Sequence, residues 1–117
     1  MFTIPENLRV VVKSKTTVVF DSLVMDLGSL TWNKPEKATY TFTNTGTHPL
    51  IIYRVTASCG CTAVELPEKV IRPGKTGTIT ITYDAAHQGW FRKSIIVYAN
   101  TINSPVTLTI HGMVLNE

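Results

Sequence analysis

Apolar and polar residues alternate over several short stretches of the chain. Between residues 39 and 43, Tyr40 and Phe42 alternate with threonines, and residues 78–83 repeat the arrangement with isoleucine and tyrosine. Strict alternation places every second side chain on one face, as in a strand with one buried side. The pattern also predicts strands at residues 50–55, 63–66, 91–99 and 106–111, and one or two more at residues 16–20 and 27–32. No stretch has the apolar spacing of an amphipathic helix, so the chain is predicted to be all-β.

Turn-forming residues separate these stretches. Asn44-Thr45-Gly46 follows the first clear strand, and Pro73-Gly74 joins a fixed φ to a residue that accepts positive φ. Strands at a spacing of roughly 8–12 residues, with turns between them, are typical of a sandwich or a small barrel. The sequence has no linker, internal repeat or low-complexity segment. Residues 16–117 are therefore predicted to form one domain, and residues 1–15 an N-terminal extension or an extra edge strand.

The composition narrows the classes of partner. Only 16% of the 117 residues are charged, against roughly 25% in a typical soluble domain, and threonine supplies much of the remaining polarity. The net charge is +3, and Arg9, Lys13 and Lys15 form the only local concentration of basic residues. Binding to nucleic acid normally needs a dense basic face. Nucleic acid is therefore not an expected partner.

Neither a membrane-spanning helix nor an intact signal peptide is expected. The longest apolar stretches, such as residues 95–99, are far shorter than the roughly 20 residues that a spanning helix needs. Residues 1–7 lack the basic region, followed by an apolar region, with which a signal peptide begins. Two interpretations remain: a cytosolic protein, or a mature fragment whose export signal was removed.

Several short motifs follow one another in a defined order. Phe42-Thr43-Asn44-Thr45-Gly46 with Pro49-Leu50 precedes Ser58-Cys59-Gly60-Cys61-Thr62, and Pro73-Gly74-Lys75 comes next. From about Phe20 to Val114, the chain resembles a bacterial Ig-like family catalogued as domain of unknown function 1573, which is similar to Ig-like domains of the Hydin and major-sperm-protein type. The residues that continue the resemblance after these motifs are Gly89, Phe91, Lys93, Asn100, Leu108, Ile110 and Gly112.

The resemblance implies a fold, a location and a class of function. The fold is an Ig-like antiparallel β-sandwich of about seven strands. The location is that of an exported protein in the periplasm, the cell envelope or the cell surface. No enzyme activity and no cofactor are implied. The expected function is therefore a non-enzymatic binding or structural module for protein–protein contact or envelope assembly, acting through its loops or an open sheet edge.

Cys59-Gly60-Cys61 is the motif that carries the most chemistry. On a flat strand, residues i and i+2 hold their Cβ atoms roughly 6–7 Å apart, whereas a disulfide needs about 3.5–4.5 Å. A bridge between Cys59 and Cys61 therefore requires a bend, which Gly60 can supply. Closing so short a loop gains only about 1.5 kcal/mol before strain, and such a bridge is comparatively reducible. Its uses are to lock a turn, or to serve redox or metal chemistry.

A metal site is one alternative for the two cysteines. Structural zinc takes four ligands and the sequence has no second cysteine pair, whereas copper(I) accepts a small number of soft thiolates. Because the connections of an Ig-like sandwich collect at two ends, His87 is expected at the same end as Cys59 and Cys61, where it could complete a copper(I) site. The simpler interpretation is that both sulfurs are small buried groups that hold the turn.

The remaining candidate residues, which are tryptophans, histidines and carboxylates, point less clearly to a function. Trp32 and Trp90 could mark a contact surface, because tryptophan is enriched at binding hot spots, although each adjoins a predicted strand and could equally pack in the core. His48, beside a turn, and His111, on the last strand, are expected to face solvent. The carboxylates are scattered, so no set of nucleophile, base and orienting group can be assembled and no catalytic residue is predicted.

Overall fold

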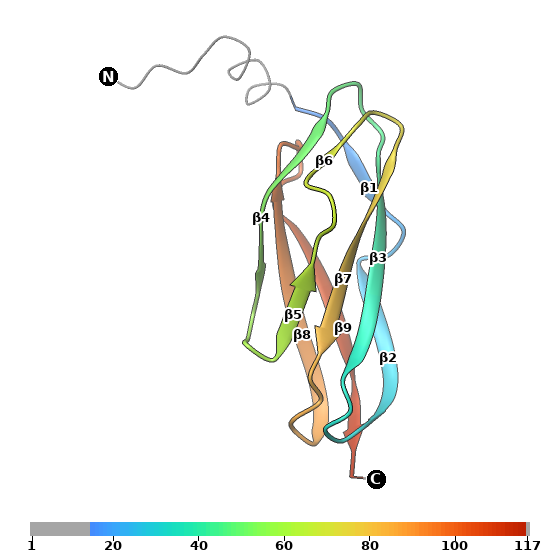
Figure 1. Cartoon of the computed structure of the whole chain (residues 1–117), viewed down its shortest axis with the longest axis vertical. Helices are drawn as coiled ribbons and strands as arrows, with labels where there is room; N and C mark the ends of the chain where they lie inside the picture. Colours follow the sequence, from blue (N-terminus) through green and yellow to red (C-terminus); the bar gives the residue numbers. More distant parts are fainter. Residues whose placement is uncertain (1–14, 117) are drawn as a thin grey trace, which may run out of the picture.

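The structure, a computed structural model, describes residues 15–116, and within this range it contains strands and no helix. The nine strands form two sheets, ordered β1-β3-β7-β5 and β2-β9-β8-β4-β6, which pack as a sandwich (Figure 1). No helix that could cross a membrane occurs in this range. The expected all-β, Ig-like sandwich is confirmed. The strands are β1 (Val18–Phe20), β2 (Val24–Thr31), β3 (Glu36–Asn44), β4 (Leu50–Ala57), β5 (Thr62–Glu65), β6 (Val70–Ile71), β7 (Thr76–Tyr83), β8 (Gly89–Ala99) and β9 (Val106–Leu115).

The alternating pattern accounts for the central pair of the four-stranded sheet. Strand β3 pairs antiparallel with β7, and Tyr40 lies opposite Ile79 with both side chains fully buried. The threonines between the apolar residues face outward, where Thr39 lies opposite Thr80 and Thr41 opposite Thr78. Because β-branched side chains fit a pleated surface, threonine favours the strand while keeping its outer face polar.

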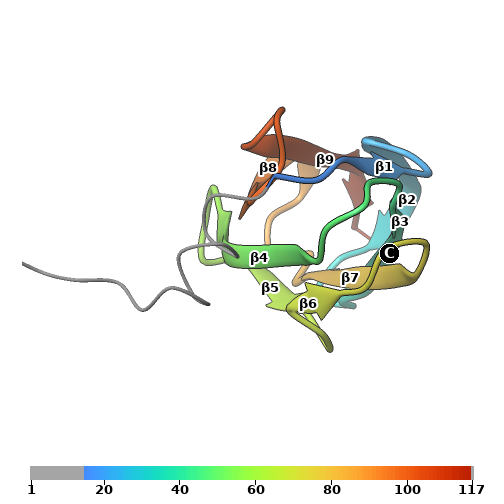
Figure 2. The ribbon, with the colours of Figure 1, turned by 90° about the horizontal axis from the view of Figure 1, so that it is seen from above.

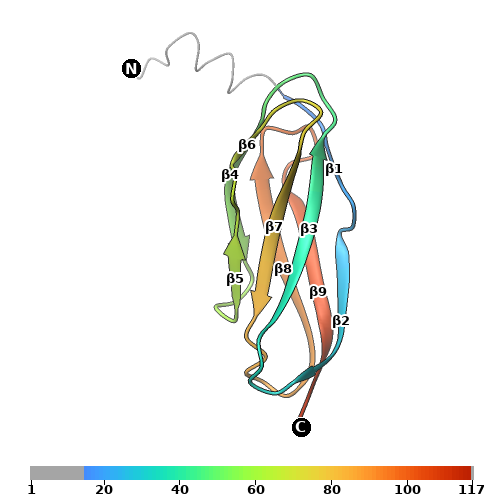
Figure 3. The ribbon, with the colours of Figure 1, turned by 45° about the vertical axis from the view of Figure 1, so that its right-hand side comes forward.

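The first described segment divides its pairing between the two sheets. Strand β1 pairs antiparallel with β3, whereas β2, only a few residues later, pairs parallel with β9 (Figure 3). This differs from the purely antiparallel sandwich of about seven strands that was expected. The reason is geometric. The segment runs along the open side of the sandwich, so β1 extends the four-stranded sheet beside β3, and β2 extends the five-stranded sheet beside β9.

The segment between β4 and β7 closes the opposite side in the same way. Strand β5 pairs with β7, and the two-residue β6 then pairs with β4. Seen from above, β1 and β2 lie on one side of the core and β5 and β6 on the other, between the two sheets (Figure 2). Strand β6 was not predicted, because two residues are too few to show alternation. These two divided segments raise the number of strands to nine.

The core fills the space between the sheets and links them directly. The rings of Tyr83 on β7 and Phe91 on β8 stack between the sheets with centroids 4.1 Å apart, and within the four-stranded sheet Phe20 packs against Phe42 with centroids 5.3 Å apart. Aromatic contacts of this kind contribute beyond the burial of their area. The other buried apolar residues are Leu30, Ala38, Tyr40, Leu50, Ile52, Ile71, Ile79, Ile81, Ala85, Ile95, Val97, Ala99, Leu108, Ile110 and Val114.

Candidate functional site

The two cysteines lie in the connection between β4 and β5, where the chain crosses from the five-stranded to the four-stranded sheet. Cys59 and Cys61 are joined as a disulfide, with Cα atoms 5.3 Å apart. The Cys61 N–H donates a hydrogen bond to Cys59 Sγ at 3.3 Å, and Thr62 Oγ1 donates to the Cys59 carbonyl at 3.3 Å. Gly60, between them, is exposed. The motif therefore forms a tight turn that carries a disulfide.

Backbone hydrogen bonds hold this turn on both sides. The Ser58 N–H donates to the Ser94 carbonyl at 2.9 Å, and the Ser94 N–H donates to Ser58 Oγ at 3.1 Å. The Asp84 N–H donates to the Cys61 carbonyl at 3.0 Å. The turn is thus anchored to β8 on one side and to the end of β7 on the other, independently of the sulfur–sulfur bond.

The sequence also placed His87 at this end, as a third ligand of a copper(I) site. His87 is exposed in the connection between β7 and β8, which begins beside the cysteine turn at Asp84. However, residues 15–116 bring no three His, Cys, Asp or Glu side chains close enough together to hold a metal ion. The structure therefore offers no support for a metal centre made by Cys59, Cys61 and His87.

The two tryptophans lie near the end of β9. Trp90 is the second residue of β8 and lies opposite Met113, with 80% of its surface exposed. Trp32 directly follows β2; its backbone N–H donates to the Leu115 carbonyl at 2.9 Å, and its Nε1–H donates to the Ala86 carbonyl at 3.0 Å. Trp32 is 42% exposed. Neither indole lies in the core. The Trp32 indole holds the loop at Ala86 through its hydrogen bond, whereas no hydrogen bond of the Trp90 indole occurs among the described contacts.

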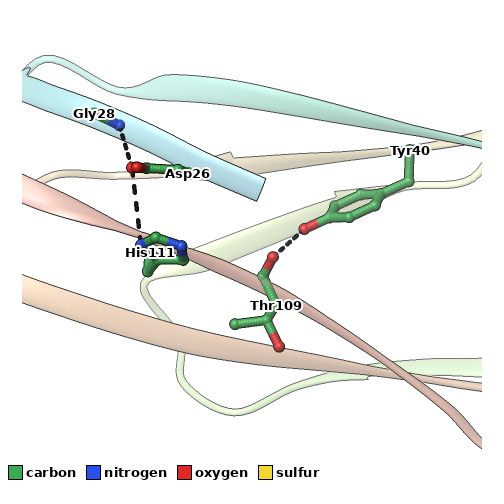
Figure 4. Close-up of polar contacts among 5 residues, drawn as sticks. All are labelled: Asp26, Gly28, Tyr40, Thr109 and His111. Atoms are coloured by element: carbon green, nitrogen blue, oxygen red, sulfur yellow. Dashed lines mark hydrogen bonds and ion pairs between the residues drawn. The ribbon is translucent and has the colours of Figure 1, made fainter. Parts of the chain in front are cut away.

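A pair of titratable side chains that the sequence did not connect lies on the outer face of the five-stranded sheet. The parallel register of β2 and β9 places Asp26 opposite His111, with Asp26 Oδ1 3.8 Å from His111 Nδ1 (Figure 4). The Gly28 N–H donates to the same oxygen at 2.8 Å. The Asp26 side chain is 67% exposed, and exposed pairs of this kind contribute little to stability. His48, by contrast, is exposed in a turn, as expected.

A buried tyrosine joins the two sheets. Tyr40 Oη donates a hydrogen bond to the carbonyl of Thr109 on the opposite sheet (Figure 4). Burial raises the pKa of Tyr40 to about 12, because the charged form loses its hydration. The phenol is therefore held as a neutral donor, which suits a structural link and not a catalytic base.

The Asn-Thr-Gly motif also proves to be structural. Asn44 Oδ1 accepts hydrogen bonds from Thr16 Oγ1 at 2.7 Å and from the Gly46 N–H at 3.1 Å. Its Nδ2 donates to the carbonyls of His48 at 2.8 Å and Ile71 at 2.9 Å. A Cβ at Gly46 would lie 2.0 Å from Thr16 Oγ1, so the chain can pass here only if residue 46 lacks a side chain. One asparagine thus fixes three chain segments at the end of the sandwich.

A second asparagine secures the same end. Asn100 Oδ1 accepts from the Ile51 N–H at 2.7 Å, and Asn100 Nδ2 donates to the Pro49 carbonyl at 2.8 Å. The Thr16 N–H donates to the Asn100 carbonyl at 3.0 Å. The sequence showed both asparagines as motif residues, but only the fold shows which groups they bind: backbone groups and, for Asn44, also the Thr16 hydroxyl.

Neither of the following two hollows on the surface of the described residues is lined by a set of nucleophile, base and orienting acid. The first, of about 450 Å³ beside β1 and the start of β9, is lined by Val18, Val19, Phe20, Leu23, Asn103, Pro105, Val106 and Thr107. The second, of about 330 Å³ around β6, is lined by Glu68, Val70, Ile71, Arg72, Lys75 and Thr76.

Solved structures with the same fold come from bacteria and animals. A protein of unknown function from Porphyromonas gingivalis W83 superposes with a TM-score of 0.77 at 18% identity over 87% of this chain, which spans about half (48%) of that protein. The ASH/PapD-like domain of human CEP192 gives a TM-score of 0.73 at 9% identity, covering 88% of each chain. The MSP-domain-like protein SSP-19 of Caenorhabditis elegans gives 0.62 at 12% identity, over 80% of this chain and 97% of that one.

These likenesses establish an Ig-like fold of the PapD and MSP type. Other structures with the fold are parts of proteases and of a glycoside hydrolase, so the fold alone does not separate enzymes from other proteins. No curated protein matches the sequence. The family assignment comes from the sequence profile that matches residues 18–114, nearly the whole described range: the chain belongs to the family described as proteins of unknown function, DUF1573.

Proposed function

We propose that this domain is a non-enzymatic module that acts by protein–protein contact, and that it makes contact through the end of the five-stranded sheet around Trp90. The observation that carries the proposal is the exposure of Trp90: 80% of the largest side chain type faces solvent from within a regular strand. Trp is enriched at binding hot spots because it buries a large area with few rotamers to fix.

Trp90 has apolar neighbours on the same face. Met113 lies opposite it on β9, and Leu115, two residues further along the same strand, is 42% exposed. We call Trp90, Met113 and Leu115 the Trp90 patch. Burying an indole removes about 200 Å² from water, which is worth ~5 kcal/mol before the cost of association is subtracted. A partner with an apolar pocket that covers this patch would therefore gain a large hydrophobic contribution to its binding free energy.

Charged residues border the Trp90 patch along the sheet. Arg92 follows Trp90 by two positions on β8 and lies opposite His111, which in turn lies opposite Asp26 on β2. An apolar centre with a polar border is the usual composition of a protein–protein interface. The border favours a partner whose own charges complement an arginine and an aspartate.

We also infer that the protein is exported and bacterial, as the family resemblance implies. The disulfide between Cys59 and Cys61 supports this location, because disulfides persist in oxidising compartments and are rare in the cytosol.

Site-specific photocrosslinking tests the contact surface. A benzophenone amino acid replaces Trp90 in the full chain, and in a matched chain it replaces Thr78, which is exposed on the threonine face of the other sheet. In the native host, we expect discrete crosslinked products of protein mass from position 90 and none from position 78. Excess unlabelled chain should suppress these products, and a Trp90→Ala chain should do so about tenfold less well. Equal crosslinking at both positions, or none at position 90, would contradict the proposal.

A further inference from the structure

We propose that the Cys59–Cys61 disulfide is a thiol–disulfide exchange centre, in which Cys59 forms the mixed disulfide and Cys61 is the resolving thiol. Its substrate class is an accessible thiol. The proposal uses the turn between β4 and β5 and none of the residues of the Trp90 patch, so the two can fail separately.

The sulfur–sulfur bond is not needed to hold the turn. It joins residues only two positions apart, so it restricts very little of the unfolded chain. The hydrogen bonds of Ser58 with Ser94, and of Asp84 with Cys61, already tie the turn to β8 and β7. The bond can therefore open and close while both sheets stay in place, which a reversible exchange centre requires.

The turn is open to an incoming thiol. Gly60 is exposed, and a Cβ built on it would meet no atom within 4 Å apart from those of the neighbouring Cys59 and Cys61. Both cysteines are half-buried and neither is enclosed. Reactive disulfides need this access, because the attacking thiolate must reach one sulfur along the line of the sulfur–sulfur bond.

The two sulfurs differ in their surroundings. Cys61 packs against the hydrophobic core, whereas Cys59 lies outside that packing. Cys59 is therefore assigned as the sulfur that the external thiolate attacks, because Cys61 and not Cys59 is packed against the core. The Cys61 N–H, 3.3 Å from Cys59 Sγ, remains available to stabilise Cys59 when it is later released as a thiolate.

The exchange balances as two thiol–disulfide steps. In the first, an external thiolate attacks Cys59 Sγ, a bond forms between the two sulfurs, and the Cys59–Cys61 bond breaks with Cys61 leaving as a thiolate that takes up a proton. In the second, another external thiolate attacks the external sulfur of the mixed disulfide, and Cys59 leaves as a thiolate. Two thiols are oxidised to one disulfide and the protein disulfide is reduced to two thiols. In reverse, Cys61 attacks the mixed disulfide on Cys59 and expels the external thiol.

Equilibration of the full chain with glutathione tests the reactivity. The protein is incubated in buffers of graded ratios of reduced to oxidised glutathione, quenched with acid, alkylated and weighed by mass spectrometry. We expect the folded protein to become half reduced within the range of ratios that glutathione buffers, with circular dichroism unchanged. A disulfide that stays fully oxidised in the folded protein at the most reducing ratio would overturn the proposal.

Single-cysteine variants test the two roles. With oxidised glutathione, Cys61→Ala should form the mixed disulfide on Cys59 at least tenfold faster than Cys59→Ala forms it on Cys61. Equal rates, or the opposite order, would overturn the assignment. If either variant fails to fold, the wild-type mixed disulfide is trapped by acid early in the reaction and located by fragmentation; glutathione on Cys59 supports the assignment and glutathione on Cys61 overturns it. Trp90→Ala should exchange at the wild-type rate.

Two substrate arms separate the sources of the thiol. One arm uses glutathione and the other a short extended peptide with a single cysteine, at equal thiolate concentration. A peptide rate at least tenfold above that of glutathione identifies a protein thiol as the substrate, and the reverse identifies a small thiol. Reaction with neither, under conditions where a denatured sample of the same chain reacts, overturns the proposal.

Discussion

Single buried polar residues connect segments that lie far apart in the sequence, and two of them, Tyr40 and Asn44, connect the two sheets. Asn44, Asn100 and Tyr40 are fully or almost fully buried, and each binds a backbone carbonyl of a distant segment. A buried carbonyl that loses its donor costs more than the bond itself contributes. These buried residues are therefore needed for folding, whereas the two proposals concern residues that solvent reaches, the exposed Trp90 and the half-buried Cys59 and Cys61.

Replacing Tyr40 by phenylalanine tests the link between the sheets. The variant keeps the ring in the core but leaves the Thr109 carbonyl without its donor. We expect the free energy of unfolding to fall by about 1–2 kcal/mol, measured by urea unfolding at neutral pH. An unchanged free energy would show that the carbonyl finds another donor.

The same variant predicts a difference in alkaline stability. Burial raises the pKa of Tyr40 to about 12, above the value of about 10 in an unfolded chain. The folded protein then keeps a proton that the unfolded chain loses, so its stability is full below pH 10 and falls as the pH rises toward 12. Urea unfolding between pH 9 and 11.5 should show a shallower fall for Tyr40→Phe than for the wild type. Some fall remains in the variant, because burial also raises the pKa of Tyr83.

At the scale of elements, the parallel pairing of β2 with β9 is the contact that depends most on particular residues. The register shifts between Asp26 and Ser29, and Gly28 has a φ of 71°, which a residue without a side chain adopts easily. At this irregularity the Gly28 carbonyl approaches Gly112 of β9 closely. The irregularity therefore relies on Gly28 for its positive φ and on Gly112 for the space that the Gly28 carbonyl occupies.

Gly112→Ala should disturb this contact directly. The new Cβ would lie 2.7 Å from the Gly28 carbonyl oxygen and 3.0 Å from the ring of Phe91. Overpacking of this kind costs about 1–3 kcal/mol, and we expect a corresponding drop in the free energy of unfolding. The matched control is Gly60→Ala, where a Cβ meets nothing within 4 Å; it should change stability by less than about 0.5 kcal/mol. Equal effects of the two substitutions would show that β2 moves away without cost.

The strands with strict alternation were predictable because their pattern is local. Residues 78–83 predicted β7 closely, because the threonines mark the outward face of the strand and the isoleucines mark the buried face. The short β6 and the parallel partner of β2 were not predictable, because both depend on which strand lies alongside and not on local order. The same limit applies to the site: the cysteine turn and both tryptophans stand out in the sequence, whereas the pairing of Asp26 with His111 arises only from the register of β2 on β9.

For the molecule as a whole, the two divided segments close both open sides of the sandwich. Residues 16–31 join β3 to β9, and residues 62–71 join β7 to β4. The second closure is the weaker one, because β6 contributes only two residues and Val70 is 55% exposed. The exchange centre proposed here lies at the start of this weaker closure, so local opening of residues 58–71 would expose it further.

Native-state hydrogen exchange should therefore separate this segment from the rest of the domain. Few buried contacts and a short ladder make local opening inexpensive, so amides of residues 62–71 should exchange with a free energy at least 2 kcal/mol below that of β3, β7, β8 and β9. The central strands should exchange only by global unfolding, with a free energy that falls with urea as the equilibrium value does. Mass spectrometry of proteolytic fragments at graded urea measures both. Reduction of the Cys59–Cys61 bond should leave the protection of both regions unchanged, because hydrogen bonds hold the turn without it. Equal protection of edge and centre would show that the sandwich opens only as one unit.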